Sequence, residues 1–456
     1  MKRIISLCLG ISPLLGISVA YGASTSQQIA QLERIVKQQQ VELAQQGRQI
    51  QRLSLRLGPS DNKLPPPSAP GMSGPIPPHS HVNIVKINPL QESVLAQASS
   101  ADNTVSISRS RLILGDKKAN VSLSGQISAM TFNASDGSNN NTFFGTNSVS
   151  PSQFNVDSEM KPAKNWVIGS HLKLGFETNS SNAVSQTTAS PTASIDTRRA
   201  EVYVKSKYLG TLFLGKGETA TDNTAYSDLS GTTLVGRATL NDIGGSLFYR
   251  IANNGLSTVT VSDTINGLDG FSRKNRVRYD TPEFGGFTVA VSAAEGGKQG
   301  AALKFGRQFG KIKFAAQMAY TSEQTFNGGT ATSANGNELN GSASVLFPVG
   351  VSLTAAGGEI QAKESGRDKP YYYYIKPGYQ SKFFPIGLTA LSIDMGQYYN
   401  FAQNNDRATS YGVQMVQNLD PWDLAMYVGY RYFALHRPGS SFDGLNLVMA
   451  GALYKF

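Results

Sequence analysis

From Val121 to the C-terminus, the chain consists of short segments in which apolar and polar residues alternate. In one of them, Trp166, Ile168 and Leu172 alternate with His171 and Lys173. A period of two places successive side chains on opposite faces of a β-strand. The pattern therefore predicts an all-β fold whose sheet has two chemically different faces.

Sixteen such segments are bounded by turn or loop signals. An even number of strands is typical of closed bacterial barrels. The segments span residues 121–134, 152–160, 165–178, 195–208, 210–217, 272–281, 285–294, 301–309, 311–321, 338–347, 349–362, 369–381, 384–400, 406–419, 422–435 and 443–456.

The connections between these segments alternate in length. Residues 209–210 and 282–286 are short connections, whereas residues 135–151 and 179–194 are long ones. Outer-membrane barrels have short turns at one end and long loops at the other, an alternation that a soluble sandwich does not require. We predict a transmembrane antiparallel β-barrel of 16 strands over residues 121–456, with its apolar face toward outer-membrane lipid and its polar face toward a lumen.

The composition excludes two other classes of protein. After the N-terminus, no segment has the roughly 20 consecutive apolar residues that a membrane-spanning helix needs. The net charge is +10, but no run of five or more basic residues occurs, so nucleic-acid binding is not expected. We interpret the positive charge as lining for a water-filled passage or as contact with anionic lipid headgroups.

Residues 1–22 are typical of a secretory signal peptide. Lys2 and Arg3 precede an apolar stretch, Ile4 to Val19, and small residues follow. We therefore expect export across the inner membrane of a Gram-negative bacterium. The only cysteine, Cys8, lies inside this peptide, so the mature protein would contain neither a disulfide nor a thiol site.

Residues 23–58 are predicted to form a helix with a heptad seam, because its apolar positions are separated by alternating steps of three and four. The seam consists of Ile29, Leu32, Val36, Leu43, Ile50, Leu53 and Leu57. An isolated amphipathic helix is marginal in water, so the seam favours a short coiled coil over packing on its own domain. The Pro-rich residues 59–120 follow as a linker and periplasmic connection. Within them, the sequence allows three structures for residues 105–114: a strand, a plug-like segment or a periplasmic connection.

The last segment carries a separate signal at the C-terminus. Val448, Ala450 and Ala452 share one face with Tyr454 and Phe456. A closing strand needs a lipid-facing row that ends in an aromatic anchor at the membrane interface. We interpret Tyr454 and Phe456 as the signal that the barrel-assembly machinery reads.

Catalysis is not expected from this sequence. The chain has four histidines, of which only His171 and His436 lie in the predicted barrel, and no G-x-S-x-G signature surrounds a serine near either. No phosphate-cradling glycine loop or paired-cysteine motif occurs. We expect no enzyme activity, no cofactor and no metal site.

Several stretches resemble the trimeric general porins of Gram-negative bacteria, especially the neisserial and related proteobacterial type. VRYDTPEFGGF at 277–287 resembles the hairpin between strands six and seven of that family. DTRRAEVYV at 196–204 and LGTLFLGK at 209–216 resemble strands four and five, and the terminal YKF also matches. The resemblance implies a homotrimer whose channels pass small hydrophilic solutes or ions by diffusion. The N-terminal coiled coil and linker depart from the usual pattern of the family.

The resemblance also implies that residues 218–271 are a third loop that folds into the barrel and narrows it. Two sets of charges would then form the pore constriction and create a transverse field that selects polar solutes. The acidic residues, on the loop, are Glu218, Asp222, Asp228 and Asp242. The basic residues, on the strands, are Arg199, Lys205, Lys274, Arg276 and Arg278. The same residues can also be ordinary solvated side chains, and residues 245–263 can instead hold an extra strand pair.

Three functions stay open from the sequence alone. The first is general diffusion, with a mild anion preference from the positive charge. The second is a substrate-specific porin for an anion or for an iron chelate such as a siderophore. The third is a structural protein that links the outer membrane to peptidoglycan through the coiled coil.

Overall fold

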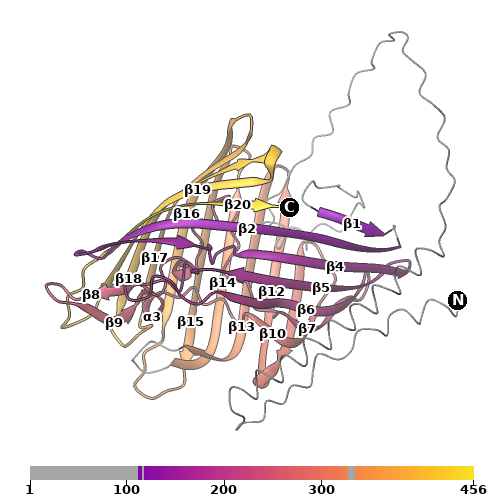
Figure 1. Ribbon diagram of the computed structural model, residues 1–456. Coiled ribbons are helices and arrows are strands. Elements are labelled where there is room, and N and C mark those ends of the chain that lie inside the picture. The colour runs from indigo at the N-terminus through magenta and orange to yellow at the C-terminus, as the bar shows by residue number, and fades with distance from the viewer. Residues whose placement is uncertain (1–110, 116–117, 327–333) are drawn as a thin grey trace, which may run out of the picture. The chain divides into compact units, whose positions relative to one another are not determined.

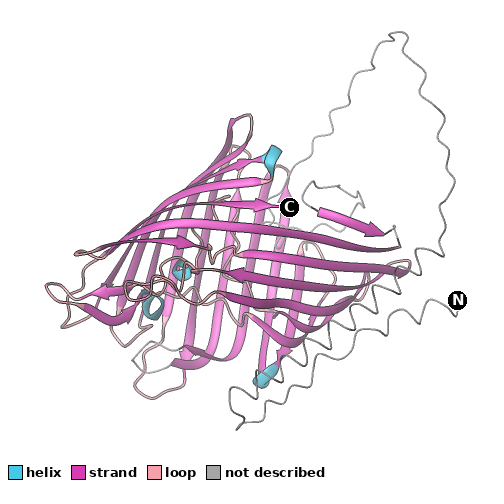
Figure 2. Ribbon diagram, in the orientation of Figure 1, coloured by secondary structure: helices cyan, strands magenta, loops and turns pink. Residues whose placement is uncertain are grey.

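The computed structural model describes residues 111–115, 118–326 and 334–456. Sixteen antiparallel strands close into a barrel in chain order. Figure 1 and Figure 2 show these long strands lying side by side around the barrel. They are β2 (Ala119–Ser135), β4 (Ser152–Ala163), β5 (Trp166–Glu177), β6 (Ser194–Ser206), β7 (Gly210–Glu218), β10 (Arg273–Asp280), β11 (Phe287–Ala294), β12 (Lys298–Phe309), β13 (Ile312–Phe326), β14 (Ala334–Leu346), β15 (Val351–Ala362), β16 (Tyr371–Phe384), β17 (Gly387–Tyr399), β18 (Arg407–Leu419), β19 (Leu424–His436) and β20 (Leu445–Lys455).

The barrel closes between its first and last strands. Residues 126–135 of β2 pair with residues 446–455 of β20. Gly125 and Phe456 then exchange two backbone hydrogen bonds, with N···O distances of 2.8 and 3.0 Å. Beyond this point the short strand β1 (Arg111–Gly115) pairs with residues 120–124 of β2, at the end of the barrel opposite β8 (Phe248–Arg250) and β9 (Leu256–Thr260) in Figure 1. Another short strand, β3 (Asn140–Gly145), pairs with the far half of β2.

The predicted fold class is confirmed, because each of the 16 predicted segments overlaps one strand of the barrel. The short connections lie at one end and contain backbone that requires glycine. Gly210, the first residue of β7 after the turn from β6, has a φ of +83°, and a Cβ there would lie 2.1 Å from the carbonyl oxygen of Asp280. At the other end the connections are long, except for Glu295–Gly297 between β11 and β12.

The outer face of the barrel is apolar along every strand. Val202, Leu214, Ile393 and Val448 belong to this exposed face. Tyr454 and Phe456 also lie on it, with ring centroids 6.2 Å apart. Such a belt is stable in lipid and unstable in water, in agreement with the predicted orientation of the two faces.

The predicted signal peptide, the coiled-coil seam and the linker as far as residue 110 lie outside the described residues. Within the ranges that are described, no helix is long and apolar enough to cross a membrane.

Candidate pore constriction

A long segment, residues 219–272, connects β7 to β10 and lies against the inner wall of the barrel. It contains a 3-10 turn (Leu240–Asp242), the strand pair β8 and β9, and one helical turn, α3 (Val261–Thr264). Much of it is buried. We call this segment the inserted loop.

Small polar side chains on the inner face of the barrel hold the first half of the inserted loop. The backbone N–H groups of Ser227 and Leu229 donate to the hydroxyls of Ser342 and Ser344 on β14, at 2.8 and 2.9 Å. Further along, the hydroxyls of Thr232 and Ser392 lie 2.6 Å apart. The two bonds from Ser227 and Leu229 satisfy backbone N–H groups that would otherwise be buried without partners. The polar inner face therefore serves as a docking surface for this part of the chain.

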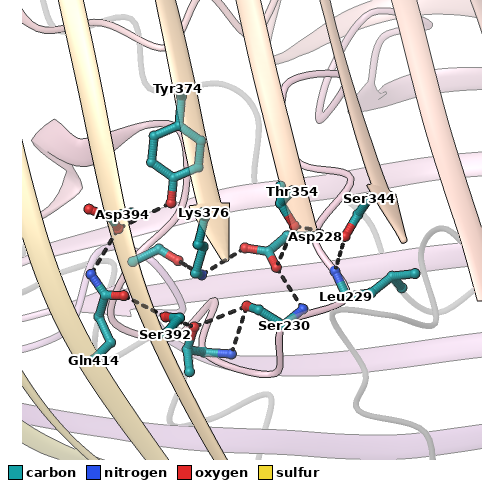
Figure 3. A network of polar contacts seen from close by, with 12 residues as sticks. Asp228, Leu229, Ser230, Ser344, Thr354, Tyr374, Lys376, Ser392, Asp394 and Gln414 are labelled. Atoms are coloured by element: carbon teal, nitrogen blue, oxygen red, sulfur yellow. Dashed lines mark hydrogen bonds and ion pairs between the residues drawn. The ribbon is translucent and has the colours of Figure 1, made fainter. Parts of the chain in front are cut away.

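A buried ion pair strengthens this attachment. Lys376 on β16 donates from Nζ to Asp228 at 2.8 Å and to the carbonyl oxygen of Gly236 at 2.6 Å. The Lys376 and Asp228 side chains are 0% and 2% exposed. Figure 3 shows that Asp394 and Tyr374 lie next to this pair. Asp228 was predicted to belong to the acidic set of the pore constriction; in the structure its carboxylate bonds to Lys376 of the barrel wall.

The second half of the inserted loop fills part of the barrel with apolar side chains. Leu240, Leu247, Tyr249 and Ile265 are buried in one hydrophobic cluster with inward-facing residues of β2, β19 and β20. Those barrel residues include Phe132, Phe433, Leu445 and Leu447. The interior on this side therefore packs like the core of a soluble protein, and any open passage must run along the remaining wall.

An ion pair holds the part of this packed region that contains β8 and β9. Arg250 of β8 donates from Nε and Nη2 to the two carboxylate oxygens of Asp136, both at 3.1 Å. The carbonyl oxygen of Arg250 accepts from the N–H of Asp443 at 2.9 Å. The hairpin of β8 and β9 is thus attached to two loops of the barrel rim.

The remaining wall carries a cluster of cationic side chains, which we call the basic wall. It consists of Lys173, Arg198, Arg199, Arg273 and Lys304, from β5, β6, β10 and β12. None is fully buried, and the side chains of Arg199 and Arg273 are 21% and 25% exposed. Glu218, at the end of β7, lies within electrostatic range of Lys173, Arg199 and Arg273. Arg198 forms an ion pair with Glu177, Arg199 with Glu201 and Arg273 with Glu218. Lys173 and Lys304 form no ion pair with a described residue, so these two cations are not neutralised by a direct partner.

The structure separates the predicted constriction residues into groups. Arg199, Glu218 and Asp222 come together at the basic wall. Arg276 and Arg278 are buried and form ion pairs with Glu201 and Asp280. These two arginines also donate to the carbonyl oxygens of residues 218 and 219, at 2.9 and 3.1 Å, and so hold the start of the inserted loop.

The other predicted residues lie elsewhere. Asp242 forms an ion pair with Arg237 inside the inserted loop, at 2.6 Å. Lys205 is exposed near the short-turn end of β6, and Lys274 is half-buried near the start of β10. A role of these residues in solute selection stays a prediction.

Sequence reasoning missed four members of the basic wall: Lys173, Arg198, Arg273 and Lys304. Lys173 had a signal, since it alternates with apolar neighbours in β5. Arg198 had no such sequence signal, because it is an extra residue in β6: Thr197 and Arg199 pair with consecutive residues of β5, and Arg198 pairs with none. A bulge of this kind breaks the period of two on which the prediction depended.

Asp222, in the inserted loop, is the titratable acid of this site. Burial raises its pKa to about 6, and the negative charge of Glu218 also raises it, whereas Arg273 lowers it. In the described part of the chain, no group of three His, Cys, Asp or Glu residues is placed to hold a metal ion.

Comparison with solved structures supports the fold. The outer-membrane protein OmpT of Vibrio cholerae is similar over 76% of this chain and 100% of its own, with 16% identity and a TM-score of 0.51. An anion-selective porin from Comamonas acidovorans is similar over 74% of this chain and 100% of its own, with 16% identity and a TM-score of 0.52. No curated protein matches the chain.

The family assignment comes from the sequence. Residues 93–435 match the family model of the Gram-negative porins, which is well over half of the 456 residues. The closed barrel of 16 strands with a segment packed inside it agrees with this match. The chain therefore belongs to the Gram-negative porins and forms a channel in the outer membrane.

Proposed function

We propose that the channel passes small hydrophilic solutes with a preference for anions, through a constriction between the inserted loop and the basic wall. The observation that carries the proposal is the pair of half-buried lysines near Glu218, Lys173 and Lys304, which form no ion pair with a described residue. Fixed positive charge beside a narrow aqueous passage raises the local concentration of anions and lowers that of cations. Ser342 and Ser344 of β14 are not available to solutes, because the inserted loop covers them.

The reversal potential of the purified protein in a planar bilayer tests this preference. In a KCl gradient we expect its sign to indicate that chloride is more permeant than potassium. A linear current at increasing concentration of a single anion would indicate general diffusion, and saturation would indicate a specific site. A cation-selective reversal potential would refute the proposed preference.

The preference is expected to increase at acid pH. Because burial raises the pKa of Asp222 to about 6, its carboxylate is ionised above that pH and neutral below it. Lowering the pH from about 7 to about 5 removes this negative charge beside the basic wall, so the chloride-to-potassium permeability ratio should rise. D222N should show the acidic ratio at both pH values. An equal pH response in D222N and the wild type would contradict this assignment.

We also propose that the protein is a homotrimer with its N-terminal segment in the periplasm. β1 and the start of β2 lie at the end of the barrel with the short turns, which is the periplasmic end in outer-membrane barrels. The heptad seam supports self-association. Semi-native electrophoresis should show a trimer before heating, and deletion of residues 24–60 should weaken it. A protein that migrates only as a monomer would contradict the proposal.

A further inference from the structure

The inner face of β14 holds both ends of the inserted loop. Asn340, Ser342 and Ser344 bond to the outgoing end: Thr224 donates to Asn340, and the N–H groups of Ser227 and Leu229 donate to the two serines. Glu338, the next inward residue of the strand, bonds to the returning end. Its Oε1 accepts from the N–H of Gly270 at 2.7 Å and from Nδ2 of Asn340 at 2.7 Å. Glu338 is the one ionisable member of these four.

The environment of Glu338 does not suit a carboxylate anion. The residue is 0% exposed, its Oε2 has no hydrogen-bond partner, and no described Lys, Arg or His lies within 4.0 Å of it. A fully buried carboxylate without a cation is costly, and proteins usually neutralise such a group. The neutral acid keeps Oε1 as an acceptor for Gly270 and gives Oε2 a hydrogen to donate.

An acceptor for that hydrogen lies on the neighbouring strand. Thr321 of β13 stands directly opposite Glu338 in the sheet register. It is also 0% exposed, and its hydroxyl has no partner. Side chains directly opposite in an antiparallel pair have Cβ atoms about 4.5–5.5 Å apart. The two unpaired buried oxygens, Glu338 Oε2 and Thr321 Oγ1, thus belong to side chains that are opposite each other in this strand pair.

The other groups packed around Glu338 supply no positive charge. Ile360 of β15 is opposite Glu338 in the sheet, on the side away from β13. Tyr372 of β16 lies within electrostatic range of Glu338 and Asp269, and its hydroxyl has no partner. Asp269 precedes Gly270 in the inserted loop and accepts from the N–H groups of Asn223 and Ala225. Burial raises the pKa of Asp269, so this end of the inserted loop offers no charge that would stabilise an ionised Glu338.

The backbone beside Gly270 is held in an unfavourable conformation. Leu268 has a φ of +39° and Gly270 a φ of +68°. A positive φ is unfavourable for leucine, and the surrounding contacts have to maintain it. Loss of the Gly270 bond would remove one of these contacts.

We propose that Glu338 is a neutral carboxylic acid that fastens the returning end of the inserted loop, and that its ionisation at alkaline pH releases this end. The residue is a positioning residue, since it acts on the passage only through the inserted loop. The inference does not depend on which solute the channel passes. It adds a second carboxyl group, besides Asp222, whose ionisation responds to pH.

Hydrogen exchange of the full-length protein in detergent tests the proposal. In the wild type, peptides that cover residues 266–272 should exchange at least about tenfold faster at about pH 9 than at about pH 6, after correction for the intrinsic rate; the loss of one hydrogen bond to a buried carboxyl is enough for this change. E338Q keeps the shape and the acceptor but cannot ionise, so its exchange should stay slow at both pH values. E359Q is the matched control, because it removes a half-exposed glutamate on β15 that pairs with Lys369, and it should behave like the wild type.

Two results would overturn the proposal. In the first, the wild type and E338Q show the same alkaline increase in exchange. In the second, E338Q already exchanges rapidly at about pH 6, which would mean that the ionised carboxylate fastens the inserted loop. Both readouts are independent of conductance, so the proposed anion preference can fail while this inference stands.

Discussion

Replacing Lys376 by methionine is expected to detach the first half of the inserted loop and to raise the single-channel conductance. The substitution removes the cation from a buried pair and leaves Asp228 with hydrogen bonds from Ser230 and Thr354 only. Removing one partner of a buried ion pair typically costs about 3–5 kcal/mol. The cost falls on the attachment of the inserted loop, because Lys376 also donates to Gly236 in it.

Limited proteolysis and bilayer recordings would measure this effect. K376M should expose residues 223–236 to protease and widen the distribution of conductance levels. K382M changes an exposed lysine of the same strand and should match the wild type. The double variant D228N/K376M should recover part of the loss, since it leaves no unpaired charge. Unchanged protease resistance in K376M would show that this ion pair does not hold the inserted loop.

The second large effect is expected from charge reversal in the basic wall. K173E/K304E changes the charge beside the passage by four units. At about 8 Å and an effective dielectric constant of about 20, one unit charge contributes about 2 kcal/mol to the energy of a passing ion before salt screening. The chloride-to-potassium permeability ratio should therefore fall by at least about tenfold, equivalent to 1.4 kcal/mol, and the channel should become cation-selective.

The matched control is K207E/K311E, which changes the total charge equally at two exposed turns. Its permeability ratio should stay close to that of the wild type, because surface charges far from the passage are screened by salt. K173Q/K304Q should give about half of the shift of the double reversal. A similar shift in the control and in K173E/K304E would assign selectivity to the net charge of the protein instead of the basic wall.

The barrel was predictable because each strand has one face toward lipid and one toward polar groups or water. Alternation identified all 16 strands, and positions such as Gly210 marked the short turns. The last strands carried a further signal that was not used. Leu445, Leu447 and Val448 make β20 apolar on both faces, which is typical of a strand that is buried on both sides. This signal predicts protein packed inside the barrel at that point.

The partners of the individual charges were not predictable. Asp228 and Lys376 are 148 residues apart in the chain, and no local pattern shows that they meet. Asp222 and Asp228 look alike in the sequence, yet one lies at the basic wall and the other in the anchoring pair. The path of the inserted loop decides between these roles, and that path depends on contacts with β14 and β16.

The arrangement at the closing seam sets an order on the formation of the molecule. One edge of β2 is shared by β1, which is made before it, and β20, which is made last. The pairing of β1 with β2 needs only neighbouring residues, whereas the adjoining edge of β2 can pair only when the final residues of the chain are present. A longer β1 would occupy the positions that β20 needs. The length of the β1–β2 hairpin therefore leaves residues 125–135 of β2 unpaired on this edge, and there β20 and Phe456 bind.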